Sequence, residues 1–310
     1  MKPLVLNAWS RASREESVVC LESTAPPAEV LIGKPRPLPE GDFSVPIEVR
    51  GLGLGMAPDD ILVADGLIRK VRVGIQNAAP DAAPYAKLDV ILEHAVEPVF
   101  TTVPGMPARI EVSFSRSPLQ PVFAGRVIAV DPGHGGKDIG LRGPVNLLEK
   151  NIALEIALVL HNMLRECGAT VLMSRDRDCD VDPRQWTSTL LVARPDLLVE
   201  IHASGERDPM ARSYHVCARR GSEESARAAC SIAAALVERM GIRIMGVEES
   251  DFVAVPIWPA VRVEPLCLTH FVDEANFRAP LFRKRIAQAI FNGISRYFTS
   301  LARGGAENVG

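Results

Sequence analysis

Hydrophobic and polar residues alternate, partly or strictly, in five short stretches of the first 115 residues, and proline, glycine and aspartate clusters separate them. An alternation with a period of two places every second side chain on one face of a strand, so each stretch predicts a half-buried β-strand. Short strands with turn residues between them indicate an antiparallel sandwich with polar outer faces. The five stretches are residues 17–22, 44–49, 68–73, 87–93 and 108–114.

From residue 126 onward the pattern changes to short apolar strands that alternate with helices. In the first helix Ile152 and Ile156 fall on one face at helical spacing, and Gly168 after the last turn suits a left-handed cap. This order predicts an α/β domain with a largely parallel, twisted sheet flanked by helices, in which ligands bind beyond the carboxyl ends of the strands. The expected strands are 127–131, 169–173, 197–202 and 260–264, and the expected helices are 149–166, 222–240 and 279–300.

The change of pattern divides the 310 residues into two domains. We expect an all-β domain over residues 1–115 and an α/β domain over residues 126–303. Residues 116–125, which contain two prolines, predict a linker. The glycine-rich end, residues 304–310, predicts a disordered tail.

Composition narrows the class of protein. The hydrophobic fraction of 47% can form a sizeable core, and the formal net charge of −3 without a basic stripe argues against nucleic-acid binding. The sequence contains no run of about 18 apolar residues and therefore predicts no membrane span. No export signal is recognisable near Met1. The six cysteines lack a C-x-x-C spacing, which favours isolated core thiols over a cysteine zinc site. We expect a monomer.

Two histidines and one glutamate are the candidate metal ligands. The strand over 127–131 leads into a turn that places His134 between glycines, the next strand ends on His202, and Glu149 opens a helix. Two imidazoles and a carboxylate are a common catalytic zinc set. Each residue also has a simpler explanation: His134 as a turn residue, and Glu149 as a helix N-terminal acid worth about 0.3–1 kcal/mol.

Glu264 is the candidate proton carrier, because it ends the strand over 260–264. Metal-assisted hydrolysis of an amide needs a carboxylate that takes a proton from water and returns it to the leaving amine. Spacing alone supports equally well a solvated acid at the end of a strand.

Five motifs of the second domain, spread over about residues 126–300, resemble zinc-dependent N-acetylmuramoyl-L-alanine amidases in order and spacing. The β domain resembles the AMIN domain that precedes such catalytic domains in Gram-negative bacteria. The similar segments are residues 5–9 and 68–74. The five motifs are Val127-Ile-Ala-Val-Asp-Pro-Gly-His-Gly-Gly-Lys-Asp138, Leu148-Glu-Lys-Asn-Ile-Ala-Leu154, Ser174-Arg-Asp-Arg-Asp178, Ile201-His-Ala-Ser204 and Val261-Arg-Val-Glu264.

The resemblance implies one zinc ion per chain, held by His134, Glu149 and His202, with Glu264 as the catalytic carboxylate. The implied substrate is the amide that joins the lactyl group of N-acetylmuramic acid to L-alanine in peptidoglycan, cleaved in cell-wall remodelling and daughter-cell separation. It also implies a periplasmic location, cell-wall targeting by the AMIN-like domain, and cell-division or activator proteins as further partners. Without a visible export signal, a cytoplasmic location stays open.

Several positions depart from the family pattern. The strand before His202 carries Glu200 where serine is usual, and Ser204 replaces an asparagine or aspartate. An ungapped count places Trp186 and Leu191 where the family often has arginine and asparagine. After Glu264 the pattern also differs, and His270 is a candidate to assist the oxyanion or a loop residue without a role. A weak or inactive wall-binding homologue and a zinc peptidase acting on another amide are therefore the alternative functions.

Two of the changes predict an ion pair. Glu200 lies two residues before His202 and Arg262 two before Glu264, so each points to the same side of its strand as the site residue. If the strands are neighbours, Glu200 and Arg262 form a salt bridge beneath the metal site.

The length of the interval from Ser213 to Val263 indicates whether the chain has a regulatory helix. Regulated amidases of this family carry a helix there that blocks the zinc, and this interval has room for little more than one strand, one helix and a connection. We therefore predict that the chain lacks an autoinhibitory helix.

Overall fold

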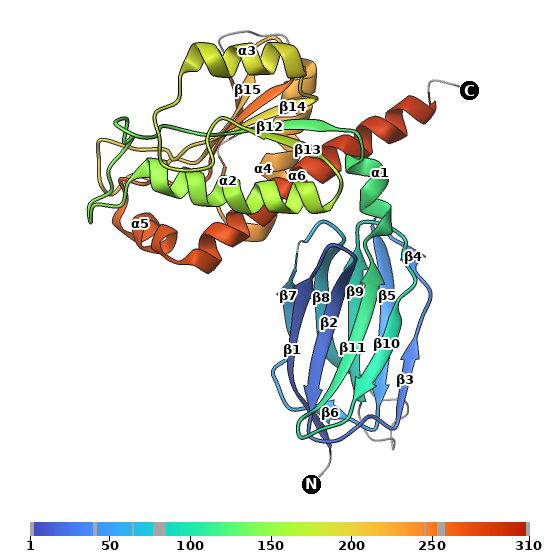
Figure 1. Ribbon diagram of the computed structural model, residues 1–310. Coiled ribbons are helices and arrows are strands. Elements are labelled where there is room, and N and C mark those ends of the chain that lie inside the picture. The colour runs from blue at the N-terminus through green and yellow to red at the C-terminus, as the bar shows by residue number, and fades with distance from the viewer. Residues whose placement is uncertain are drawn as a thin grey trace. The chain divides into compact units, whose positions relative to one another are not determined.

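The protein consists of two compact units, Met1–Pro121 and Val122–Gly310, in the computed structural model (Figure 1). The structure describes residues 3–39, 42–63, 65–76, 85–244, 246–252 and 258–307. Among these residues, no helix is both long and apolar enough to cross a membrane. Each unit is described separately below.

The first unit is the predicted all-β sandwich, in which two sheets lie face to face (Figure 1). One sheet has the strand order β10-β11-β2-β1-β6 and the other β3-β5-β9-β8-β7, with β4 paired to β5. Pairing is antiparallel except between β1 and β6. The strands are β1 Leu4–Ala12, β2 Glu16–Ser23, β3 Glu29–Ile32, β4 Arg36–Pro37, β5 Phe43–Arg50, β6 Gly53–Leu54, β7 Asp59–Leu62, β8 Ile68–Gln76, β9 Tyr85–Leu92, β10 Val99–Val103 and β11 Ala108–Ser115.

All five strands predicted from alternation are present, as β2, β5, β8, β9 and β11. In β5, for example, Val45, Ile47 and Val49 are fully buried while the residues between them are partly exposed. Most residues of the remaining strands are exposed or only partly buried, so their apolar pattern is weak. All five residues of the edge strand β10 are exposed. Neither face of this strand is buried, so its sequence shows no alternation that would predict a strand.

The second unit is the predicted α/β domain, built on one six-stranded sheet with the order β13-β12-β14-β17-β15-β16. Neighbouring strands are parallel except β15 and β17. Helices α2, α4 and α6 lie along one face of the sheet and α3 along the other (Figure 1). The elements are β12 Val127–Pro132, α2 Glu149–Glu166, β13 Thr170–Met173, α3 Pro183–Ala193, β14 Leu197–Ile201, β15 His215–Arg219, α4 Glu223–Met240, β16 Val247–Ser250, β17 Ala260–Glu264, α5 Phe271–Arg278 and α6 Pro280–Glu307.

Alternation along the central strands gives both faces of this sheet a core. Ala129 of β12, Leu198 of β14 and Ala260 of β17 point toward α3 and pack with its Leu190. The next residue along each of these strands faces the other helices. Because both faces are covered, these strands read as nearly continuous apolar runs. Helix α2 ends as predicted, with Gly168 at φ 95° after the last turn.

Short helices occupy the predicted linker, which contains a 3₁₀ helix, Ser117–Leu119, and helix α1, Gln120–Phe123. The boundary between the two units falls within this stretch, after Pro121, and the Phe123 ring stacks on Phe291 of α6 at 5.1 Å. Helix α6 extends to Glu307, into the stretch for which the sequence predicted a disordered tail. Residues 308–310 lie outside the described part.

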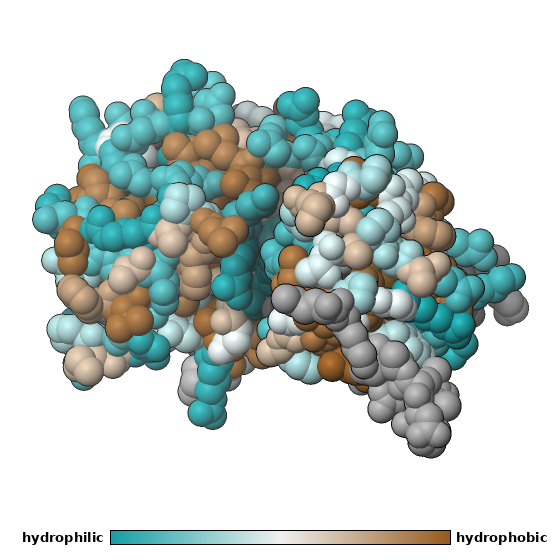
Figure 2. Space-filling view, turned by 90° about the horizontal axis from the view of Figure 1, so that it is seen from below, coloured by the Kyte–Doolittle hydropathy of each residue, from teal (hydrophilic) through white to brown (hydrophobic). Residues whose placement is uncertain are grey.

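On the face seen in Figure 2, small groups of hydrophobic residues are separated by hydrophilic ones. The residues coloured there form no broad apolar patch of the kind that marks a large protein interface.

Gly293 in α6 generates a test of how closely α4 and α6 pack. A Cβ atom at Gly293 would lie 2.4 Å from the Ile232 Cα of α4. We expect Gly293→Ala to force the helices apart and to lower the free energy of unfolding by about 1–3 kcal/mol, although alanine favours helix. Denaturant unfolding measures this. The exposed Lys284→Ala in the same helix is the control and should change stability by less than about 0.5 kcal/mol. An equal decrease in the free energy of unfolding of both variants would contradict the close packing of α4 and α6.

Candidate metal centre

The candidate residues meet at the carboxyl edge of the parallel strands. His134 follows β12, His202 follows β14, and Glu264 ends β17, the strand next to β14. Backbone hydrogen bonds join the strand ends: Gly133 N donates to Ile201 O at 2.9 Å, and His202 N donates to Val263 O at 3.0 Å. The strand ends therefore hold the two histidine-bearing segments side by side.

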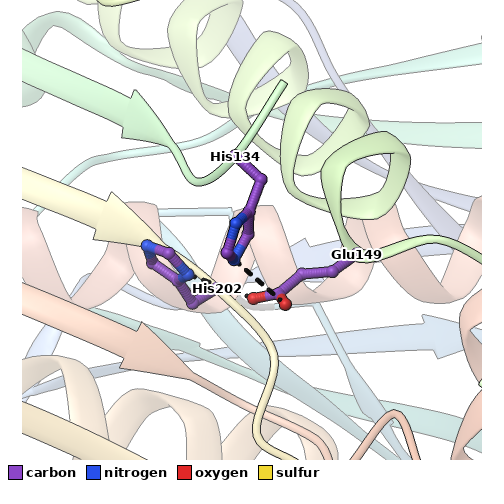
Figure 3. Close-up of side chains that lie close together, drawn as sticks. All are labelled: His134, Glu149 and His202. Atoms are coloured by element: carbon purple, nitrogen blue, oxygen red, sulfur yellow. Dashed lines mark hydrogen bonds and ion pairs between the residues drawn. The ribbon is translucent and has the colours of Figure 1, made fainter. Parts of the chain in front are cut away.

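His134, Glu149 and His202 form one group, in which the Glu149 carboxylate faces both imidazole rings (Figure 3). Glu149 Oε2 lies 3.1 Å from His134 Nε2, and Glu149 Oε1 lies 3.0 Å from His202 Nδ1. The two rings are 5.0 Å apart and nearly perpendicular. One possible ligand atom from each residue lies within 4.8 Å of the others.

Glu149 is the buried centre of this group, with 2% of its surface exposed. Besides the imidazoles, its two oxygens accept hydrogen bonds from Leu141 N at 2.8 Å and Ala203 N at 2.9 Å. Burial by itself raises the pKa of the Glu149 carboxyl. The hydrogen bonds from both histidines and both amides outweigh burial and hold the pKa below its usual range. Glu149 is thus held as an oriented carboxylate.

His134 is oriented by a second acid that the sequence analysis gave no role. Its Nδ1 lies 2.9 Å from Asp138 Oδ2, on the opposite side of the ring from Glu149. The hydrogen bond to Glu149, and then the one to Asp138, raise the pKa of His134 to about 9. A carboxylate on the outer nitrogen fixes the tautomer of a metal-binding histidine. The one available indication was the position of Asp138 at the end of the first motif.

Two glycines let the backbone approach the group closely. A Cβ atom at Gly133 would lie 2.3 Å from His202 Cε1, and one at Gly140 would lie 2.5 Å from His134 Cδ2. Gly140 also has φ +65°, which disfavours any side chain. The group therefore requires glycine at both positions.

The geometry fits a zinc ion. Donor atoms around tetrahedral zinc are about 3.3 Å apart, since each lies about 2.0–2.1 Å from the metal. The separation from His134 Nε2 to one Glu149 oxygen is 3.1 Å and that from His202 Nδ1 to the other is 3.0 Å, both close to this spacing. Two imidazoles and one carboxylate with a fourth position left open are also the donor set of catalytic zinc sites.

Glu264 lies next to the group but outside it. It is opposite His215 in the antiparallel pair of β17 and β15, and it shares a sheet face with Arg262, two residues earlier. Burial raises the pKa of the Glu264 carboxyl, although His202, Arg262 and His215 oppose the increase. A carboxyl group whose pKa is raised is better suited to return a proton to a leaving group than one at its usual pKa.

The predicted ion pair is present beneath the group. Glu200 and Arg262 are register partners in β14 and β17, and Arg262 Nη2 lies 2.8 Å from Glu200 Oε2. Arg262 also stacks on the Phe252 ring at 4.9 Å. Burial raises the pKa of the Glu200 carboxyl, and Arg262 opposes that increase. Each charge of the pair is thus satisfied by the other.

The structure gives His270 contacts with an arginine and an aspartate, and its role at the oxyanion stays a prediction. It is 7% exposed and precedes helix α5. Its ring nitrogens lie 3.2 Å from Arg212 Nε, and Nδ1 lies 4.0 Å from Asp273 Oδ1. These contacts assign His270 to the base of helix α5.

The interval between His202 and Glu264 bears on autoinhibition. Within its described residues, α4 is the one helix, and it packs against α6, where Arg296 Nη2 pairs with Glu238 Oε2 at 2.9 Å. The acid in the histidine group comes from α2, before the interval. Residues 245 and 253–257 of the interval lie outside the described part.

Comparisons with known proteins agree with this geometry. Residues 128–296 match the family model described as N-acetylmuramoyl-L-alanine amidase. The N-acetylmuramoyl-L-alanine amidase LytC of Bacillus subtilis is 29% identical over 178 residues, which are 56% of this chain and 36% of LytC. The match thus spans about a third of that relative.

Solved structures share the fold of the second unit. The crystal structure of an N-acetylmuramoyl-L-alanine amidase from Clostridium difficile 630 has a TM-score of 0.54 and 25% identity, over 56% of this chain and 97% of that one. The CwlD amidase from Clostridioides difficile, solved in complex with the GerS lipoprotein, has a TM-score of 0.51 and 21% identity, over 57% and 100%.

Metal content tests the group directly. We expect about one zinc ion per chain, and we expect His134→Ala or His202→Ala to lose it, as measured by metal analysis and competition titration. In the metal-free protein His134 has a pKa of about 9, so below that pH zinc must displace its proton, and affinity should fall as the pH falls. His161→Ala, outside the group, is the control. Full zinc retention in both site variants would exclude this group as the metal centre.

Breaking the Glu200–Arg262 pair from one side should destabilise the second unit. Arg262→Ala leaves Glu200 buried without its cation, so we expect the free energy of unfolding to fall by about 3 kcal/mol. Asp251→Ala, which breaks the exposed pair with Arg220, is the control and should cost less than about 1 kcal/mol. Chemical denaturation measures the free energy of unfolding of both variants. A similar small decrease in both would mean that water solvates the Glu200–Arg262 pair.

Proposed function

Because the chain belongs to the N-acetylmuramoyl-L-alanine amidase family, we propose that it is a zinc-dependent hydrolase of peptidoglycan. Its substrate in this proposal is the amide between the lactyl group of N-acetylmuramic acid and L-alanine of the stem peptide. One observation carries the proposal: His134, Glu149 and His202 converge at the carboxyl edge of the sheet, where Glu264 ends the neighbouring strand.

In this proposal His134, Glu149 and His202 hold the ion, and Asp138 orients His134. When bound, zinc polarises the amide carbonyl and lowers the pKa of a water molecule. The buried Glu149, fixed by two backbone amides, keeps the two imidazoles at their separation. The protein thereby provides three ligands and leaves a position for substrate or water.

Glu264 serves as the general base and then the general acid. Its position beside His202 brings it next to the ion, and its raised pKa suits the exchange of a proton with water and with the leaving amine. His202, Arg262 and His215 oppose that increase and so favour the carboxylate. In this proposal Glu264 accepts a proton from water before it donates one to the amine.

We assign the first unit a role in cell-wall targeting, from its sandwich fold and its resemblance to AMIN domains. The proposed site of action is the periplasm, in wall remodelling and daughter-cell separation. CwlD was solved in complex with the GerS lipoprotein, which supports the search for a protein partner of this chain, and an activator is the partner that we propose.

The decisive assay measures release of stem peptides from purified murein. We expect release by the intact protein, loss on chelation and recovery with zinc. Glu264→Gln should lower the rate by roughly 10²–10⁴-fold with zinc content unchanged, because it removes the proton carrier but no ligand. The exposed Glu223→Gln in α4 is the control and should retain full activity.

The same assay separates the alternative functions. Binding to murein without release, in zinc-loaded protein, would indicate an inactive wall-binding homologue. Release of products cut elsewhere in the stem peptide would indicate a peptidase with another bond specificity. Full activity of Glu264→Gln would remove Glu264 from the mechanism.

A further inference from the structure

Arg175 lies directly behind the metal group and is almost fully buried, with 3% of its surface exposed. It follows strand β13 by two residues, in the third of the sequence motifs. Its guanidinium donates to four backbone carbonyl oxygens: Nε to Pro132 at 3.1 Å, Nη2 to Gly133 at 2.9 Å and to Lys150 at 2.8 Å, and Nη1 to Arg177 at 3.3 Å.

Two of these carbonyls adjoin metal ligands. Gly133 immediately precedes His134, and Lys150 immediately follows Glu149. A single nitrogen, Nη2, bonds both. Arg175 therefore joins the loop that carries one ligand to the helix that carries another, and a planar guanidinium fixes the direction as well as the distance.

The loop that Arg175 holds has an unfavourable backbone. His134 has φ 62° and Gly135 has φ 142°, and a non-glycine residue in the left-handed region persists only where its surroundings hold it there. A Cβ atom at Gly135 would lie 2.9 Å from Arg175 Cδ, so the loop lies directly on this side chain.

Lys150 and Asp178 hold the other end of the loop. Lys150 Nζ donates to Gly136 O at 2.8 Å and pairs with Asp178 Oδ2 at 2.6 Å. Asp178 Oδ1 accepts from Gly136 N at 2.8 Å. Arg175, Lys150 and Asp178, hereafter the loop clamp, thus bond the backbone of the loop on both sides of His134.

The hydrogen bonds and burial of Arg175 indicate that this residue orients the backbone around it. Burial lowers the pKa of its guanidinium, and Asp178 and Asp131 offset this only at a distance. The four hydrogen bonds described for Arg175 all end on backbone carbonyls, so the charge lacks the direct carboxylate that a buried cation usually has. An apolar side chain could fill the space, but it could not orient four carbonyls.

We propose that the loop clamp, with Arg175 at its centre, is a positioning device that sets the separation of His134 and Glu149 and thereby the affinity for zinc. The inference rests on the proposed function only in that the group binds zinc. A purely structural clamp would change stability and leave metal affinity as it is. A positioning clamp changes metal affinity and ligand geometry in protein that remains folded.

The test uses the full chain with Arg175→Lys, which keeps the charge but loses the planar fork, and Arg175→Gln. Zinc affinity is measured by competition with a chromogenic chelator, ligand geometry by the visible spectrum of the cobalt-loaded protein, and folding by denaturation of the chelated protein. We expect both variants to bind zinc about 10–100-fold more weakly and to show an altered cobalt spectrum. Arg283→Lys, a mostly buried arginine in α6 that bonds Phe277 O and Glu155, is the matched control and should leave both unchanged.

Unchanged zinc affinity and an unchanged cobalt spectrum in folded Arg175 variants would overturn the proposal, whatever their stability. If the Arg175 variants do not fold, Asp178→Ala, at a half-exposed position, decides: weaker zinc binding supports the clamp, and wild-type binding contradicts it. Absence of zinc binding by the wild-type protein would instead refute the proposed function, so the two failures are distinguishable.

Discussion

The buried carboxylate of Glu149 is the interaction on which the site depends. Each of its oxygens accepts one imidazole contact and one backbone N–H. Those four partners come from the loop after β12, the residues that follow it and the end of β14. A buried carboxylate must have all of its acceptor sites satisfied, so this one residue requires the three segments to meet. The ligand group is therefore a consequence of folding as much as a feature added to the fold.

The sequence singled out His134 and His202 because they violate the local pattern, and the structure places both beside Glu149. They are polar residues at the ends of apolar strands, and glycines flank the first of them. The Glu200–Arg262 pair followed from strand periodicity, since a period of two puts residues 200 and 202 on one side. The histidine group needed β12 and β14 to be neighbours, and the ion pair needed β14 and β17 to be neighbours.

Other features left weaker traces in the sequence. Helix α3 begins at Asp182-Pro183, an N-cap followed by proline, and Asp182 accepts a hydrogen bond from Arg184 N. This start was recognisable, but few of the helix residues are buried, so the apolar stripe is short. The role of Arg175 could not be read from residue types at all, because its partners are backbone carbonyls, which every residue has.

The strand order of the second unit has a further consequence for how the site exists at all. After β12 the chain crosses to β13 on one side of it, and it later returns to β14 on the other side. Such a reversal is a topological switch point, and ligands of open α/β sheets bind at this position, beyond the carboxyl ends of the strands. His134 follows β12 and His202 follows β14, so the switch point lies between them. The path of the chain thus places the histidine group where the connections from neighbouring strands run in opposite directions.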